Sequence, residues 1–315
     1  MPTVSYVVTL FDKAPFLPYL CAGLAAQEGP FEREYIFVDD GSRDSTADRL
    51  ATIVAGWPRT TVLRQANAGP AVALNRGLAA ATGEFVKPVD GDDVLLPWGT
   101  RRLLDALTAT GVEMATALYP EQPRYQPEGD PDTLLALTPP PDAGAASGAV
   151  LWDLLPASLR RCQTQPSLWL LRRQAALACG GCDEGVFAQD YSLELRLAAR
   201  GKVARVPGPV VLIAGRAPGR VSENEAQMLH DGNRTVCRFL RQHPSLPPSL
   251  RRLALRRTAG RAWLWESRRN GQGVLSRSFA LRIAAALGRL QPDEATEMAL
   301  CAPFRATQPI RVPPG

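Results

Sequence analysis

The first ninety residues alternate between short apolar runs and segments with apolar positions at helical spacing. Four apolar, largely β-branched or aromatic runs predict strands, at 3–10, 35–38, 61–63 and 85–89. Three helices are predicted between them, from about 15 to 27, around Ala47, Leu50 and Ile53, and from about 70 to 81. Strands that are apolar on both faces and alternate with helices indicate a parallel sheet covered by helices.

Two of the predicted strands end in carboxylates. Asp39 and Asp40 follow the second strand, and Asp90, Asp92 and Asp93 follow the fourth. Ligands of open α/β sheets bind outside the carboxyl ends of the strands, so we expect Thr9 and these carboxylates at one edge. Hard carboxylate oxygens suit Mg²⁺ or Mn²⁺ shared with substrate phosphates, although Asp-Gly-Asp-Asp alone is equally typical of a turn. Neither a dinucleotide-binding glycine motif nor a P-loop occurs.

The second half of the chain continues the pattern and then changes. A helix is predicted from Pro97 to Gly111, a strand at 112–118, and two closing strands at 203–207 and 210–213. Residues 120–148 are rich in Pro, Gly, Ala and Asp, and we expect a long loop over the acceptor side of the site. Beyond about 221 the pattern becomes helical.

Composition is that of a globular protein, with 45% hydrophobic and 21% charged residues in 315. The formal net charge of +5 is modest, nearly all basic residues are Arg, and we expect no nucleic-acid partner. No run of about 20 apolar residues and no export signal is present, which predicts a cytoplasmic protein. The six cysteines are expected to be reduced and structural, and the isolated Cys179–Cys182 pair is favoured as structural over zinc or redox chemistry.

Several motifs in order resemble the family 2 glycosyltransferases of the GT-A fold. The segments that carry the resemblance are 4–9, 35–46, 67–69, 73–78, 81–86 and 90–93, the last resembling a D-x-D-D metal motif. The family implies a Rossmann-like, mostly parallel α/β sheet flanked by helices. We therefore predict a GT-A nucleotide-sugar glycosyltransferase domain over 1–215 and a helical, Arg-rich extension over 216–315.

The resemblance assigns roles to individual residues. Thr9, Asp40 and the adjacent Asp39 are expected to hold the nucleotide, with Asn75 near the donor. Asp90 and Asp92 are expected to bind Mn²⁺ or Mg²⁺. An inverting transfer needs a carboxylate to take the proton of the attacking hydroxyl, and Asp190 matches the family's catalytic base, although Asp also favours such a position as a helix cap.

The implied reaction is a metal-dependent, inverting transfer of a sugar from a nucleotide-diphosphate donor, expected to be of the UDP type, to a saccharide or lipid-linked hydroxyl. Surface polysaccharide or glycolipid synthesis is the expected setting. Gln189 stands where the family usually has Glu, and Gly215-Arg216-Ala217-Pro218 replaces a segment that often carries a metal-approaching His. A non-catalytic sugar-nucleotide-binding protein of the same fold is therefore the alternative.

Ten arginines and a single Glu lie between 251 and 290, among Trp263, Trp265 and other apolar residues. Two interpretations stay open. The composition favours helices that pack their apolar face on the catalytic domain. A basic amphipathic surface would instead give peripheral contact with anionic lipid at the inner membrane face, where a lipid-linked acceptor would sit.

Overall fold

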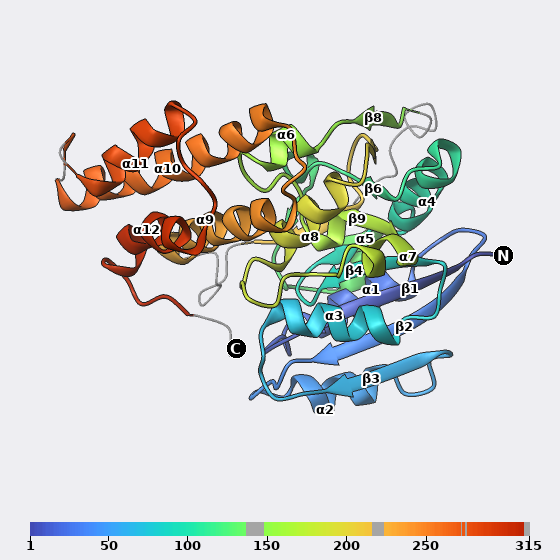
Figure 1. Ribbon diagram of the computed structural model, residues 1–315. Helices are drawn as coiled ribbons and strands as arrows, with labels where there is room; N and C mark the ends of the chain where they lie inside the picture. Colours follow the sequence, from blue (N-terminus) through green and yellow to red (C-terminus); the bar gives the residue numbers. More distant parts are fainter. Residues whose placement is uncertain (137–147, 216–223, 272, 275, 312–315) are drawn as a thin grey trace.

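A large sheet forms the centre of the molecule in the computed structural model, which describes residues 1–136, 148–215, 224–271, 273–274 and 276–311 (Figure 1). Its strand order is β3-β2-β1-β4-β9-β6-β10-β8. The strands are β1 (Thr3–Leu10), β2 (Glu32–Asp39), β3 (Thr60–Arg64), β4 (Phe85–Asp90), β6 (Met114–Thr116), β8 (Val150–Trp152), β9 (Trp169–Arg172) and β10 (Val203–Arg205). The first four strands are mutually parallel, whereas β9 runs antiparallel to β4 and β6. The predicted mostly parallel α/β sheet is confirmed.

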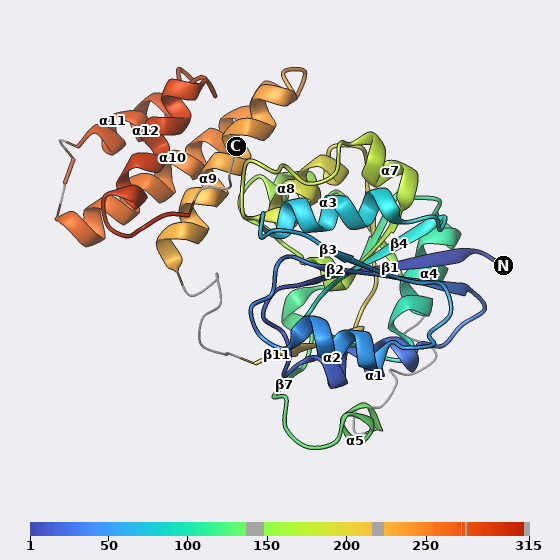
Figure 2. The same cartoon turned by 90° about the horizontal axis from the view of Figure 1, so that it is seen from below.

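Helices cover both faces of this sheet, which is why its central strands are apolar throughout. Figure 2 shows α1 (Leu17–Ala25) and α2 (Thr46–Ile53) on one side and α3 (Pro70–Ala80), α7 (Arg173–Ala178) and α8 (Gln189–Ala198) on the other. Helix α4 (Gly99–Thr110) packs on β6, β9 and β10 and ends at Gly111, whose φ of 70° suits glycine. Helix α3 approaches β1 so closely that a Cβ on Gly77 would lie 2.2 Å from Cγ1 of Val7.

A second, three-stranded sheet has the order β5-β11-β7, from β5 (Val94–Leu95), β11 (Val211–Ala214) and β7 (Arg124–Tyr125). The two predicted closing strands thus form, but they join different sheets. The expectation of a structureless 120–148 loop is wrong, because this stretch contains β7, part of a 3₁₀ turn at Tyr119–Glu121 and α5 (Pro131–Ala136). Tyr125 is buried in a small apolar cluster with Tyr19, which gives the stretch a core to pack against. Residues 137–147 lie outside the described residues.

Two short helical elements complete the domain, α6 (Leu155–Ser158) and a 3₁₀ turn at Pro166–Leu168. Both precede β9, which contributes the fully buried Trp169. The indole of Trp169 donates to Oγ1 of Thr164 at 2.6 Å, so the segment between α6 and β9 is tied to the core.

Four helices follow the sheet: α9 (Glu225–Gln242), α10 (Pro248–Asn270), α11 (Arg277–Ala286) and α12 (Glu294–Arg305). They lie on the side of the sheet away from the N-terminus, the side toward which the parallel strands run (Figure 1). Helix α9 packs against α8, α10 and α12 and so joins the helices to the sheet domain. None of the described helices combines the length and hydropathy needed to cross a bilayer. The domain boundary at 215/216 remains a prediction, since 216–223 lie outside the described residues.

Candidate active site

A cavity of about 880 Å³ opens at the carboxyl ends of β1, β2 and β4. The strand register places Thr9 opposite Asp90, and Leu10 opposite Asp39, so the acidic strand ends meet around the end of β1. Thr9, Asp40, Asp90 and Asp92 line the cavity together with Gln189. The expectation that the acidic strand ends share one edge is therefore confirmed. Asp-Gly-Asp-Asp is also a turn, closed by a hydrogen bond from Asp93 N to Asp90 O at 3.0 Å, so the turn and the cavity lining are the same segment.

Asp40 shapes the wall of this cavity. Its carboxylate accepts hydrogen bonds from Nε2 of Gln65 at 2.8 Å, from Ala68 N at 2.9 Å and from Gly69 N at 2.9 Å. Gly69 has a φ of 93°, which lets the chain turn into α3 directly after these bonds. Asp40 therefore fixes the loop before α3 while remaining at the cavity surface.

Asp39, by contrast, is only 1% exposed and does not line the cavity. It accepts from Ser42 N at 3.0 Å and pairs with Arg64 at 3.2 Å. These bonds hold the turn after β2, and its predicted contact with a nucleotide remains a prediction.

Asp90 lies among carboxylates that disfavour its ionised form, although the buried Lys87 interacts with the charges of Asp90 and Asp93. Burial, reinforced by the charges of Asp93, Asp92 and Asp190, raises the pKa of Asp90 well above its ordinary value, and Lys13 only partly opposes this. Nε2 of Gln189 donates to Asp90 at 3.3 Å, and Lys13 Nζ lies 2.7 Å from Asp92. A cation placed between the carboxylates of Asp90 and Asp92 would relieve the repulsion.

The carboxylates of Asp90 and Asp92 fit a metal ion that takes its other ligands from a substrate. In the described ranges, no group of three or more His, Cys, Asp or Glu side chains is placed to hold a metal ion by itself. Two carboxylates facing an open cavity suit Mg²⁺ or Mn²⁺, which typically takes its remaining ligands from phosphates and water. Of the two histidines, His230 is buried between Asp231 and Arg305, and His243 stacks on Phe239, so neither reaches the cavity.

Asp190 lies in the first turn of α8, next to Gln189. Its Oδ1 accepts from Tyr191 N at 2.7 Å, and the Cys162 thiol lies 3.8 Å from Oδ2. Burial raises the pKa of Asp190 from its ordinary value, and these two hydrogen bonds oppose the shift. The N-cap residue of the helix is Ala188, so Asp190 is not the cap. Asp190 does not line the cavity, whereas its neighbour Gln189 does, and its charge reaches Asp90.

Asn75 is held away from the cavity. Its side chain exchanges hydrogen bonds with the backbone of Cys182 at 2.7 and 3.0 Å and donates to Glu184 at 2.8 Å. It thereby ties α3 to the segment before α8, and its expected place near the donor remains a prediction. Cys179 and Cys182 form no disulfide with each other, and their structural role remains a prediction.

Sequence reasoning missed three side chains that matter here. Lys13 pairs with Asp92. The sequence has only three lysines, and this rarity is the feature that could have drawn attention to Lys13. The sequence shows Gln189 only as a departure from the family pattern. In the structure Gln189 links the start of α8 to Asp90. Arg311 lines the cavity from the segment after α12, nearly 300 residues from Lys13, and nothing in the sequence indicated it.

Comparison with protein families gives one match over this region: residues 5–134 match the model described as Glycosyl transferase family 2. Among curated proteins, the chain is 33% identical over 115 residues to the succinoglycan biosynthesis protein ExoO of Rhizobium meliloti, covering 36% of this chain and 32% of that protein. It is 42% identical over 64 residues to the uncharacterized glycosyltransferase YibD of Escherichia coli, covering 20% and 19%. The matches thus span about a third or less of these relatives.

Solved structures match over nearly the whole chain. S. aureus TarS 1-349 in complex with UDP-GlcNAc aligns with a TM-score of 0.58 at 15% identity, covering 99% of this chain and 93% of that one. The mannosyltransferase PcManGT from Pyrobaculum calidifontis, in complex with GDP-Man and Mn²⁺, aligns with a TM-score of 0.53 at 19% identity, covering 93% and 88%. At these identities the likeness establishes the fold, including the helical region after the sheet.

Proposed function

We propose that this chain, which belongs to glycosyl transferase family 2 through residues 5–134, transfers a sugar from a nucleoside-diphosphate donor to a hydroxyl acceptor. The carrying observation is the cavity lined by Thr9, Asp40, Asp90, Asp92 and Gln189. In this proposal the nucleoside lies at Thr9 and Asp40 and its diphosphate lies at Asp90 and Asp92. Of the named relatives, one is a succinoglycan biosynthesis protein and the other is an uncharacterized glycosyltransferase, which supports sugar transfer in a polysaccharide setting.

Asp190 is the proposed base. Its carboxylate takes the proton of the acceptor hydroxyl while that oxygen forms a bond to the anomeric carbon. The bond from this carbon to the diphosphate oxygen breaks on the opposite face, and the nucleoside diphosphate leaves with the bonding electrons, which inverts the anomeric centre. Burial raises the pKa of Asp190, which makes its carboxylate a stronger base than that of an exposed Asp.

Asp90 and Asp92 would hold Mn²⁺ or Mg²⁺. The bound cation supplies positive charge to the departing diphosphate. Lys13, already 2.7 Å from Asp92, holds that carboxylate in place and adds a second positive charge at the same wall. Gln189 positions Asp90 through its amide and leaves its own Oε1 buried without a hydrogen-bond donor among the described residues.

Thermal unfolding with UDP, GDP, dTDP and CDP, each with and without Mn²⁺ or Mg²⁺, tests the donor site. The structural neighbours were solved with UDP-GlcNAc and with GDP-Man, so the panel includes both UDP and GDP. UDP is the expected ligand. A ligand at 100 times its Kd adds about 2.7 kcal/mol, or roughly 4 °C for a chain of this size. We expect one diphosphate to stabilise only with metal and Asp92→Ala to abolish the effect. Stabilisation by none of them would overturn the proposal.

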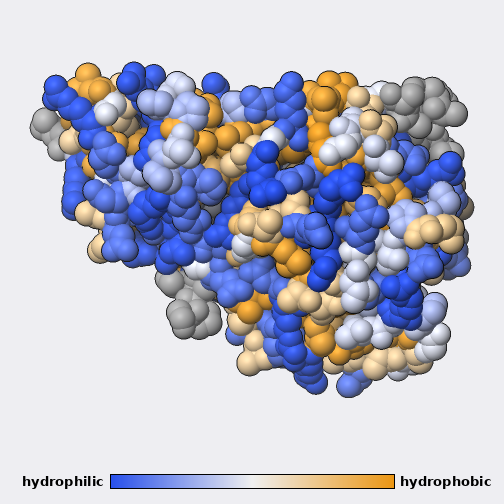
Figure 3. Space-filling view, turned by 45° about the vertical axis from the view of Figure 1, so that its right-hand side comes forward, coloured by the Kyte–Doolittle hydropathy of each residue, from blue (hydrophilic) through white to orange (hydrophobic). Residues whose placement is uncertain are grey.

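The helical region contributes the proposed contact with a membrane. Helices α10 and α11 enclose a groove of about 930 Å³ lined by Arg160, Arg252, Arg256, Arg257 and Arg282 and by aromatic and aliphatic side chains. Within the described part of the chain none of these arginines forms an ion pair with a carboxylate. Leu264 and Ile283 are 43% and 44% exposed beside them. Figure 3 shows hydrophobic residues on the otherwise mostly hydrophilic surface of this region, at the left of the view.

Cationic and apolar side chains interleaved on one surface suit the interface of an anionic bilayer. Flotation with vesicles that contain anionic lipid tests the idea, with purely zwitterionic vesicles as the reference. Arg256→Glu should reduce flotation, whereas Arg49→Glu on α2, an exposed site far from α10, should not. Absence of binding to anionic vesicles would dispose of the membrane contact and leave the sugar-transfer proposal untouched.

A further inference from the structure

The charged lining of the donor cavity leaves one basic side chain without a partner. Three basic residues of the described chain line it, namely Lys13, Arg43 and Arg311. Lys13 pairs with Asp92 at 2.7 Å and Arg43 pairs with Asp12 at 2.6 Å. Arg311 makes no ion pair among the described residues, and its side chain is exposed.

The backbone that carries Arg311 is firmly anchored. The buried side chain of Gln227, on α9, accepts from Arg311 N at 2.7 Å and donates to Arg311 O at 3.0 Å. Just upstream, Asn224 Nδ2 donates to Pro309 O at 3.2 Å and the Trp265 indole donates to Thr307 at 3.0 Å. Ile310 also packs on the main core. These contacts fix where the segment runs, so the position of Arg311 at the cavity is a built feature.

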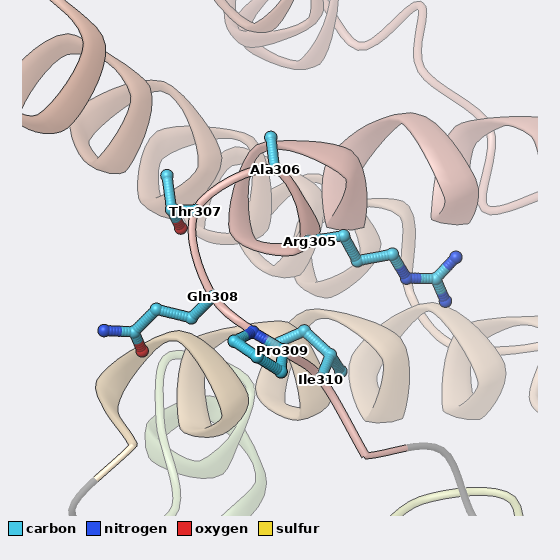
Figure 4. A pocket seen from close by; sticks show the side chains of 6 residues that line it. All are labelled: Arg305, Ala306, Thr307, Gln308, Pro309 and Ile310. Carbon is cyan, nitrogen blue, oxygen red and sulfur yellow. The ribbon is translucent and has the colours of Figure 1, made fainter.

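This anchoring reverses the direction of the chain. Figure 4 shows residues 305–310 turning at the end of α12, with the side chains of Arg305 and Gln308 pointing to opposite sides. After the turn, the segment crosses the first turn of α9 and brings Arg311 to the carboxyl edge of the sheet, where Asp90 and Gln189 also line the cavity. The helical region thereby supplies a group to a site otherwise made by the sheet domain.

A planar guanidinium matches phosphate oxygens with two parallel hydrogen bonds, and it stays protonated at any working pH. The other charges in the cavity are four aspartates and two basic residues already paired with two of them. A diphosphate that enters this acidic cavity therefore meets Arg311 as the unpaired cation of the lining. We propose that Arg311 binds the diphosphate of the nucleotide, an inference that rests on the function proposed above.

The test compares the Kd of a nucleoside with the Kd of its diphosphate, measured by titration calorimetry or ligand-observed NMR. Both ligands carry the nucleobase identified by the thermal unfolding panel, and Mn²⁺ is present in both measurements. Arg311→Ala should raise the Kd of the diphosphate about tenfold and leave the Kd of the nucleoside unchanged, as expected for loss of a charge-assisted hydrogen bond. Arg311→Lys should recover part of the loss. Arg268→Ala, which removes an exposed arginine of α10, is the control with the same change in net charge.

The outcomes separate this inference from the proposed function. If the wild type binds a diphosphate that depends on Asp92, and Arg311→Ala binds it equally well or more tightly, Arg311 does not bind the phosphates and only this inference fails. If Arg311→Ala weakens nucleoside and diphosphate alike, the residue acts on the shape of the cavity and the inference fails as well. If the wild type binds no diphosphate, the proposed function fails and this inference with it.

Discussion

Glu194 offers a quantitative test of how α8, the helix that carries the proposed base Asp190, is held. Its side chain is fully buried, one turn after Asp190. The carboxylate accepts from Ser158 Oγ at 2.6 Å, from Thr164 N and Oγ1 at 2.8 and 2.7 Å, and from Gln163 N at 3.0 Å. It therefore fixes the 158–164 segment against α8.

Burial raises the pKa of Glu194 from 4.5 to about 7, despite these hydrogen bonds. The folded state consequently binds the proton more tightly than the unfolded state. This contribution to stability is fully present below pH 4.5 and is lost as the pH rises through 7. A difference of roughly 2.5 pH units at about 1.36 kcal/mol each corresponds to about 3 kcal/mol.

Glu194→Gln removes the titration while keeping the shape of the side chain. We expect the free energy of unfolding of the wild type, measured in urea and compared with the variant at each pH, to fall by about 2 to 3 kcal/mol between pH 5 and pH 8. Glu113→Gln is the control, because Glu113 is partly exposed and pairs with Arg200, and its pKa is lowered mainly by the hydrogen bond from Arg200. Parallel stability curves for the wild type and Glu194→Gln would refute the reasoning, since they would mean that Glu194 does not titrate in this range.

Two further predictions address catalysis and packing. Asp190→Asn should lower the rate of sugar transfer, or of donor hydrolysis, by at least about 100-fold while the Kd for the nucleoside diphosphate stays the same, and a retained rate would exclude Asp190 as the base. Gly77→Ala should destabilise the fold by about 1 to 3 kcal/mol in urea unfolding because its Cβ would overlap Val7, whereas Gly260→Ala in α10, with no atom within 4 Å of the added Cβ, should stabilise it by up to about 1 kcal/mol. Equal effects of the two glycine substitutions would contradict the close packing of α3 on β1.

Apart from the two-residue β5, which pairs with the distant β11, the order of elements through residue 118 followed from the sequence because it depends on local patterns. Apolar β-branched runs form strands, Pro70 starts α3, and Gly111 ends α4 with a left-handed backbone. The expectation for 120–148 failed because β7 and α5 are stabilised by partners distant in sequence. Arg124 and Tyr125 pair with β11 almost ninety residues later, a contact that composition does not reveal.

The acidic strand ends were also determined by the sequence. In a parallel sheet consecutive strands end at the same edge, so Asp40, Asp90 and Asp92 had to converge once β2 and β4 were assigned to one sheet. The match to the glycosyl transferase family 2 model lies in the same segment, since it covers residues 5–134.

Only the tertiary structure decided how each of these side chains is used. Asp39 and Asn75 are occupied by hydrogen bonds to neighbouring backbone, and Gln189 and Lys13 hold the carboxylates of Asp90 and Asp92, because helix packing sets distances that no sequence spacing encodes. The return of Arg311 to the cavity depends on its backbone bonds to Gln227 across 84 residues. Local propensity fixes which elements form and at which edge their ends meet, whereas long-range packing selects the side chains that face the ligand.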